Sequence, residues 1–256
     1  MNQKEEKYEE ALIELLYKIA DDLLIIGHRN SEWTGLGPIL EEDISFSSMA
    51  QDKIGQSMSV FNILHSLGEP EPDTNAFNRS AKFHNSQLVE LPNGEYDFSL
   101  IRHLLYDHAD QLRFEMLANS SFEPLAKLAR KIKGELKYHV YHADTLVTKL
   151  GNAKHESHDR MQKALNEAWN YALGIFEESE FEKTLIQENI FAGEKKLKEK
   201  WLNSIQSILE KAQLKIPGEG SWKPAFGGRE GHHTQHLKPL VEEMSEVFRV
   251  DPKAEW

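Results

Sequence analysis

The sequence contains no cysteine, which excludes disulfides, thiolate metal sites and cysteine nucleophiles together. No apolar run approaches the roughly 20 residues that a membrane-spanning helix needs. Positive charge is also in deficit, because 30 Lys and Arg stand against 42 Asp and Glu and give a net charge of −12. Nucleic acid is therefore not expected as a partner, since phosphates bind basic surfaces. The charged start, Met1 to Lys7, is unlike a signal peptide, and we expect a soluble cytoplasmic protein.

A helical pattern runs through most of the chain. Apolar residues recur every three or four positions, and strand-like alternation is nowhere sustained. The pattern predicts four long helices at about 6–30, 39–67, 99–119 and 125–151, and further helices between about 156 and 250. The C-terminal part is expected to hold a loop with His155 and His158, and a last helix from about Thr234 to Val250.

The connection between the second and third predicted helices, about 68–98, is rich in Pro, Asn, Asp and Ser and is much longer than a usual helix–helix link. One long crossover at this place is typical of ferritin-like bundles. We therefore predict an all-α chain with a single ferritin-like domain over 1–256. Its four-helix bundle covers about 6–151, and extra C-terminal helices follow.

One face of the helix predicted over 125–151 is apolar at both ends and polar in its middle. The polar residues are Glu135, His139 and His142, which the helical spacing places on that face. Buried polar groups cost a few kcal/mol, about 2–7, unless they are paired. These three side chains therefore need a partner on another helix.

The helix predicted over 99–119 has a similar polar middle, with Asp107 and Gln111 on one face and Asp110 on the adjoining surface. A metal ion held between the two helices is one interpretation. A buried network that joins the three polar residues of helix 125–151 to Asp107 or Gln111 is a second. Partial exposure, or a role in an interface, is a third.

The spacing of the acids argues against a working di-iron centre in this chain. Such a centre takes one Glu from each of two helices and a Glu-x-x-His pair from each of the other two. The three acids that could begin a pair are followed at i+3 by other residues: Asp52 by Gly55, Asp107 by Asp110, and Glu135 by Tyr138.

A second group of potential ligands lies near the C-terminus, from Glu230 to His236. It contains a Glu-x-x-His pair, from Glu230 to His233, and a His-x-x-x-His pair, His232 with His236, either of which could bind zinc. A polar stretch before a helix is also typical of helix capping, here by His233 or Thr234. The only candidates nearby for a coenzyme A phosphate are Lys223 and Arg229.

A set of short motifs is spread from about residue 20 to the end of the chain. They are Glu32-Trp33, Leu40-Glu-Glu-Asp-Ile44, Gly55-Gln56, Leu88-Val-Glu-x-Pro-Asn-Gly94, Tyr138-His-x-x-His-Ala143, His155-Glu-Ser-His158, Gly227-Gly-Arg-Glu-Gly-His-His-Thr-Gln-His-Leu237 and the terminal Trp256. Together they resemble phenylacetate-catabolism proteins of the C-subunit type.

The resemblance implies a ferritin-like, non-catalytic structural subunit of the multicomponent di-iron monooxygenase that epoxidises phenylacetyl-CoA. It implies that the catalytic A subunit holds the di-iron centre, and that the C subunit has no cofactor and binds both its catalytic partner and a second copy of itself. An apolar helical face left for a partner would support this hypothesis. The alternatives are a metal-binding ferritin-like oxidoreductase with an atypical Asp/Glu/His site, and an acyl-CoA-binding protein.

Overall fold

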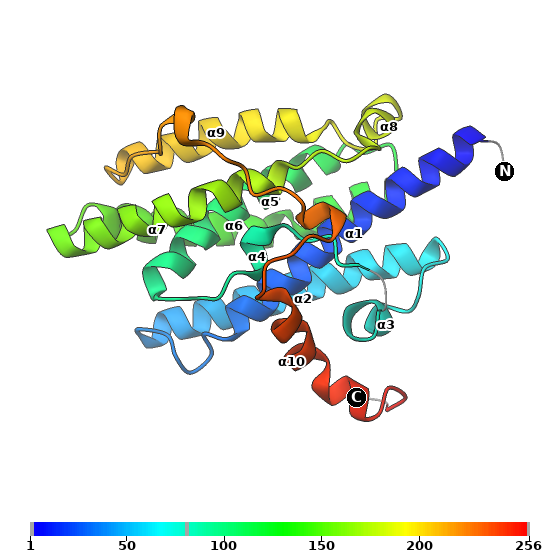
Figure 1. Ribbon diagram of the computed structural model, residues 1–256, viewed down its shortest axis with the longest axis horizontal. Helices are drawn as coiled ribbons and strands as arrows, with labels where there is room; N and C mark the ends of the chain where they lie inside the picture. Colours follow the sequence, from blue (N-terminus) through cyan, green and yellow to red (C-terminus); the bar gives the residue numbers. More distant parts are fainter. Residues whose placement is uncertain (1–2, 80–81, 255–256) are drawn as a thin grey trace. The chain divides into compact units, whose positions relative to one another are not determined.

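The computed structural model describes residues 3–79 and 82–254, and in these residues it contains ten α-helices, three short 3₁₀ helices and no strand (Figure 1). The prediction of an all-α chain is therefore confirmed. Among the described helices none is both long and apolar enough to span a bilayer. Trp256, which belongs to the motifs named above, lies outside the described residues.

The four long helices predicted from the sequence are present, with bounds close to those expected. They are α1 (Gln3–Ser31), α2 (Leu40–Ser66), α5 (Tyr96–Leu117) and α6 (Glu123–Gly151). The other α-helices are α3 (Pro72–Phe77), α4 (Gln87–Glu90), α7 (His155–Leu173), α8 (Glu182–Gln187), α9 (Glu194–Lys211) and α10 (Leu237–Val250). The 3₁₀ helices are Gly174–Phe176, Glu219–Ser221 and Gly228–Glu230.

Three local predictions differ from the structure. The crossover over 68–98 is not wholly irregular, because it contains α3 and α4. His155 and His158 lie in the first turn of α7 rather than in a loop, and the ring of His158 bonds the carbonyl of Gly151 over 2.8 Å, which closes the turn after α6. The last helix begins at Leu237 rather than near Thr234, because several of the residues before it bond to the crossover segment instead of to each other.

The described residues form two compact units, and the boundary between them runs through α1. Unit 1 contains residues 3–12 and 93–226, and unit 2 contains residues 13–79, 82–92 and 227–254. The four helices of the predicted bundle are divided between these units. The ferritin-like bundle and the single domain therefore remain predictions.

In unit 1, α5 packs against α6, α7 and α9. Trp201 of α9 is fully buried, donates its indole N–H to the carbonyl of Leu105 over 2.8 Å, and has its ring centroid 5.3 Å from that of Trp169. At the end of α6, a side chain in place of Gly151 would clash with the backbone of Ala212. The glycine thus lets α6 and the end of α9 approach closely.

In unit 2, α1 and α2 run antiparallel. The hydroxyl of Ser57 donates to the carbonyl of Ala20 over 2.8 Å, and a Cβ on Gly27 would lie 2.8 Å from Ile54. The contacts thus move backwards along α2 as they move forwards along α1. The first helix has an apolar stripe whose members recur every three or four residues. Those in this unit, which are buried, are Leu16, Ile19, Leu23 and Ile26. Helix α3 packs against α2 and α10.

Candidate functional site

Three histidines and one aspartate form a buried cluster between α5 and α6 in unit 1. Oδ1 of Asp107 accepts a hydrogen bond from Nδ1 of His139 over 3.3 Å, and its Oδ2 lies 2.5 Å from Nδ1 of His103. Nδ1 of His142 lies 3.3 Å from Nε2 of His103. All four side chains are buried, so these contacts replace water as their polar partners.

The contacts determine how His103 is protonated. Its Nδ1 carries a hydrogen, because two lone pairs at the distance seen to Asp107 would repel each other. Burial lowers the pKa of His103 below the ordinary value of 6.5, and this outweighs the opposite effect of Asp107. The ring is therefore neutral at pH 7, and its Nε2 accepts a hydrogen bond from His142. The cluster forms a continuous chain of hydrogen-bonding groups from His142 through Asp107 to His139.

This arrangement does not fit a metal centre. Both oxygens of Asp107 face ring N–H groups, whereas metal ligands must offer free lone pairs. In the part of the chain that the structure describes, no group of three or more His, Asp or Glu side chains could hold a metal ion. Of the other candidates on these helices, Asp110 is buried on α5 and Glu135 is partly exposed on α6. The geometry is that of a buried polar layer.

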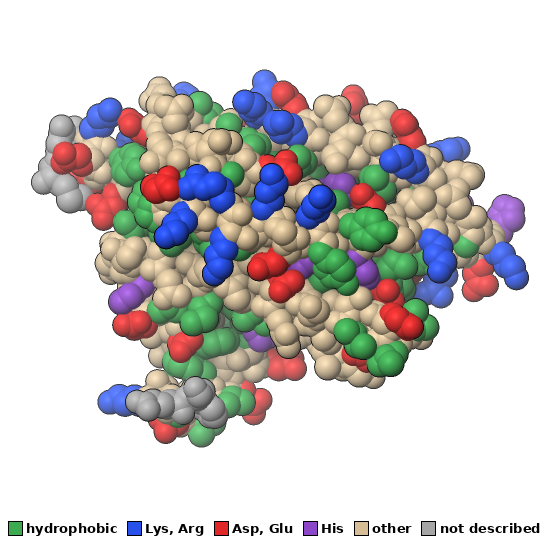
Figure 2. Space-filling view, turned by 180° about the vertical axis from the view of Figure 1, so that it is seen from behind, with side chains coloured by type: hydrophobic (Ala, Val, Ile, Leu, Met, Phe, Trp, Pro, Cys, Tyr) green, Lys and Arg blue, Asp and Glu red, His purple; other side chains and the backbone are tan. Residues whose placement is uncertain are grey.

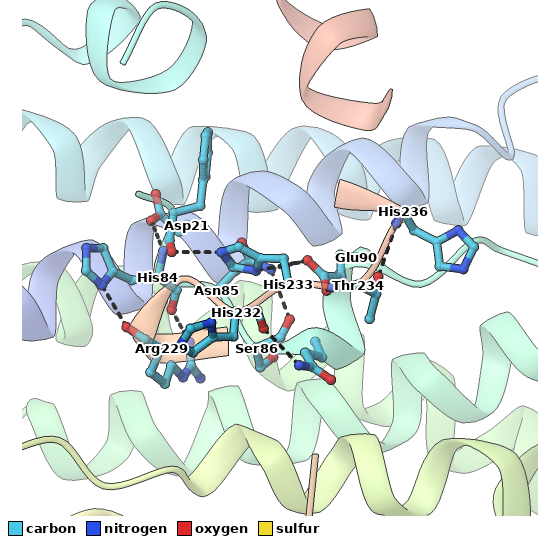
Figure 3. A network of polar contacts seen from close by, with 12 residues as sticks. Asp21, His84, Asn85, Ser86, Glu90, Arg229, His232, His233, Thr234 and His236 are labelled. Atoms are coloured by element: carbon cyan, nitrogen blue, oxygen red, sulfur yellow. Dashed lines mark hydrogen bonds and ion pairs between the residues drawn. The ribbon is translucent and has the colours of Figure 1, made fainter. Parts of the chain in front are cut away.

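A second polar network joins the crossover segment of unit 2 to residues 227–236 (Figure 3). The buried carboxylate of Glu90 accepts the backbone N–H of Thr234 at Oε1 over 2.6 Å, and its Oε2 lies 3.1 Å from Nδ1 of His233. Nε2 of His233 lies 2.9 Å from the carbonyl oxygen of Phe83. The two ring nitrogens of His233 thus lie between the carboxylate of Glu90 and the backbone of the crossover segment.

Arg229 makes the other link between these segments. Its buried guanidinium donates from Nη2 to Oδ2 of Asp22 over 2.7 Å, and from Nη1 to the carbonyl of His84 over 2.9 Å. The second oxygen of Asp22 accepts the backbone N–H of Ser86 over 2.7 Å. One carboxylate of α1 therefore binds both the crossover segment and the C-terminal segment.

The neighbouring acid on α1, Asp21, has a similar role. It accepts hydrogen bonds from Nη2 of Arg79 over 2.8 Å and from the backbone N–H of His84 over 2.7 Å. Burial raises the pKa of Asp21, against the lowering effects of Arg79 and the His84 N–H. Two adjacent acids of α1, which the sequence places beside its apolar stripe, thus anchor the crossover segment.

The residues considered for zinc do not converge. Glu230 and His232 are exposed, and their carbonyl groups accept hydrogen bonds from Lys82 and Gln87. Figure 3 shows the rings of His232 and His236 pointing in different directions. This segment serves as a connector rather than as a ligand set.

The two residues considered for a coenzyme A phosphate belong to different units. Lys223 is exposed and belongs to unit 1, whereas Arg229 is buried in unit 2 and paired with Asp22. The guanidinium of Arg229 therefore already has an anionic partner within its own unit.

The sequence is similar to known proteins over its whole length. A family model described as "Phenylacetic acid catabolic protein" matches residues 1–256. The chain belongs to this family. It is 31% identical over 241 residues to the C subunit of 1,2-phenylacetyl-CoA epoxidase from Escherichia coli (strain K12), and the match covers 93% of this chain and 96% of that relative. The family resemblance seen in the sequence is thereby confirmed.

In this phenylacetic acid catabolic protein, some of the motifs that carried the resemblance contribute to the two polar networks. Tyr138–Ala143 supplies two histidines of the first, and Gly227–Leu237 supplies the C-terminal half of the second. Sequence reasoning missed His103 and Glu90. The position of His103, four residues before Asp107 on the same helix face, was a usable signal. Glu90 lies in a segment without helical periodicity, and its only signal was its place in the motif Leu88-Val-Glu-x-Pro-Asn-Gly94.

Proposed function

We propose that this chain is a non-catalytic structural subunit of a phenylacetyl-CoA epoxidase, where it supports a catalytic subunit that holds the di-iron centre. The match to the C subunit of such an epoxidase over nearly the whole chain supports this role. A structural subunit needs a surface for a partner. Of the candidate residues for metal, Asp107, His139 and His142 belong to the buried polar cluster, and Glu230, His232 and His236 do not converge.

The observation that carries the proposal is an exposed and uncharged stripe on α2. Its residues recur every three or four positions and so lie on one helix face: Leu40, Ile44, Ser48, Gln51, Gly55, Met58 and Asn62. Leu40 is 71% exposed and Ile44 59% exposed. Large exposed apolar side chains on a face without charge are typical of the centre of a protein interface. An exposed helical face of this kind supports the structural-subunit hypothesis.

Gly55 in the middle of the α2 stripe supports the same conclusion. A glycine inside a helix costs about 1 kcal/mol relative to alanine. A Cβ at Gly55 would meet nothing within 4 Å in this chain, so internal packing does not require the glycine. A partner helix that approaches α2 closely would require it. When that partner is absent, two copies of the chain could pair through their α2 stripes, because an uncharged stripe facing its own copy brings no like charges together.

The test is co-purification with the catalytic subunit of the epoxidase. Ile44→Glu places a charge in the α2 stripe and should weaken binding at least about tenfold, since a buried unpaired charge costs several kcal/mol. Val247→Glu is the matched control, because Val247 is exposed on α10 in the same unit. It should bind like the unaltered chain.

Three results would contradict this reasoning. If the unaltered chain does not bind the catalytic subunit, the proposed role is wrong. Equal binding by Ile44→Glu and Val247→Glu would show that the α2 stripe is not the interface. Near-stoichiometric metal that disappears in His139→Ala would make this chain a metal-binding oxidoreductase instead.

A further inference from the structure

A second exposed helix face, on α6 of unit 1, is strongly basic. Six exposed side chains of α6 are cationic: Lys127, Arg130, Lys131, Lys133, Lys137 and Lys149. Of its acids, only Glu123 in the first turn is exposed, where it pairs with Arg130 over 2.5 Å, while Glu135 and Asp144 are partly buried. Figure 2 shows Lys and Arg side chains gathered in the middle of one face, beside exposed hydrophobic side chains. Because the whole chain carries −12, this separation of charge creates a local positive potential that an anionic partner would meet.

Two exposed tyrosines follow the basic residues on the same helix face. Tyr138 is 47% exposed and Tyr141 68% exposed, and their spacing of three places them side by side. Tyrosine and arginine are enriched at protein interfaces and among the residues that contribute most to binding. The combination of aromatic and basic side chains is therefore that of an interaction surface rather than of an ordinary solvated face.

Gly134 is an independent indication of close approach. It lies between Lys131 and Tyr138 on the exposed face of the 29-residue helix α6. A Cβ at Gly134 would meet nothing within 4 Å, so the packing of this chain does not explain the glycine. Because an exposed mid-helix glycine costs about 1 kcal/mol relative to alanine, its presence is explained by something outside the chain that approaches the α6 backbone.

The shape and charge of this face distinguish between classes of partner. The outer surface of a helix is convex, whereas small molecules bind in concave sites. Domains that bind nucleic acid are typically strongly basic, with a pI above about 9, whereas the sequence pI here is about 5.5. Leu125, Ile132 and Leu136 of α6 are buried and cannot enter a bilayer. A protein with an acidic surface fits all of these features.

We propose that the outer face of α6, from Lys127 to Lys149 with Tyr138 and Tyr141, is the docking surface for an acidic protein. Its occupant is another subunit of the same epoxidase, so this inference rests on the proposed function. The α6 face is distinct from the α2 stripe, because one is basic and the other uncharged. Charge complementarity makes binding at α6 fast and sensitive to salt, whereas binding at α2 depends on apolar contact.

The test measures binding of the chain to each purified subunit of the epoxidase at about 50 mM and about 300 mM NaCl, where screening differs strongly. The variant is Lys131→Glu/Lys133→Glu/Lys137→Glu. The matched control is Lys195→Glu/Lys200→Glu/Lys211→Glu, which makes the same change in net charge at exposed lysines of α9 in the same unit. We expect one subunit to bind at least about tenfold more weakly to the α6 variant, and the control to bind normally.

The other outcomes overturn the proposal. If the α6 variant and its control bind every subunit equally, docking on α6 is refuted. The proposed function would still stand if Ile44→Glu abolishes that binding. No binding by the unaltered chain would refute both. Vesicles of phosphatidylglycerol are a further probe. If they capture the unaltered chain but not the α6 variant, while both bind the subunits equally, then α6 is a lipid-binding face and the proposal is wrong.

Gly134→Ala separates docking from helix stability. Alanine should raise Tm, because it favours the helix and meets no neighbour. The added methyl group should nevertheless weaken binding of the acidic partner, about fivefold or more, by blocking close approach. A higher Tm with unchanged affinity would show that nothing approaches the helix at Gly134, and would overturn the proposed geometry.

Discussion

Replacing Arg229 by methionine tests whether residues 227–236 stabilise unit 2. Methionine keeps much of the apolar volume and removes the charge. The change removes the ion pair with Asp22 and the hydrogen bond to the His84 carbonyl. It leaves the Asp22 carboxylate buried, with the backbone N–H of Ser86 as a remaining donor.

The expected loss is large because the two charges are buried together. Breaking a buried ion pair by removing one partner costs about 3–5 kcal/mol, most of it from the charge left behind. The double variant Asp22→Asn/Arg229→Met removes that lone charge. It should therefore lose less stability than the sum of the two single variants, with a coupling of about 1–3 kcal/mol.

Hydrogen exchange measured by mass spectrometry is the suitable assay, because it reports on each unit separately. In Arg229→Met, exchange should accelerate in residues 13–31 and 82–92, while α5 and α9 of unit 1 stay protected. Arg249→Met is the control, since Arg249 is exposed on α10 of the same unit. The argument that the Asp22–Arg229 pair stabilises unit 2 would be refuted by either of two results. One is a loss of less than about 1 kcal/mol in the free energy of opening of unit 2 in Arg229→Met. The other is an equal loss in Arg229→Met and Arg249→Met.

Two further predictions concern unit 1. Burial lowers the pKa of His103 below 6.5, so below that pH the unfolded chain takes up a proton there that the folded chain does not. The free energy of unfolding is therefore unaffected by this group above pH 6.5. It falls by up to about 1.4 kcal/mol per pH unit as the pH drops from 6.5 towards the folded-state pKa. Urea unfolding at several pH values should show a shallower decline in His103→Asn, and parallel curves would contradict the assignment. Gly174→Ala should lower the free energy of unfolding by about 1–3 kcal/mol, because the new Cβ would clash with the carbonyl of Ala225. Gly218→Ala is the control, since a Cβ there meets open space. Equal Tm values for the two variants in thermal unfolding would refute this.

The long helices could be predicted because their cores repeat every three or four residues. The stripe from Leu16 to Ile26 is a clear case, since an apolar face of that length has few alternatives to a buried helix. The short helices α3, α4 and α8 could not be predicted in this way. With four to six residues each, they are too short to show a helical period, and tertiary contacts determine them.

The polar networks were predictable only in part. The polar face with His139 and Asp107 was visible because both residues interrupt apolar helical stripes. The partners of Glu90 and Arg229 were not visible, because they lie far away in the sequence and are joined by backbone groups. No spacing rule reports which carbonyl or N–H group a distant side chain will meet.

The discontinuity of unit 2 has a consequence for how the protein is made. Residues 227–254 complete a unit that begins at residue 13, so the ribosome releases the last part of unit 2 only after all of unit 1. Until then, Asp22 lacks its ion-pair partner Arg229, and Glu90 lacks the backbone N–H of Thr234. A nascent chain can therefore fold unit 1 first. Helix α2 belongs to unit 2, so it can be part of a completed unit only after residues 227–254 have been synthesised.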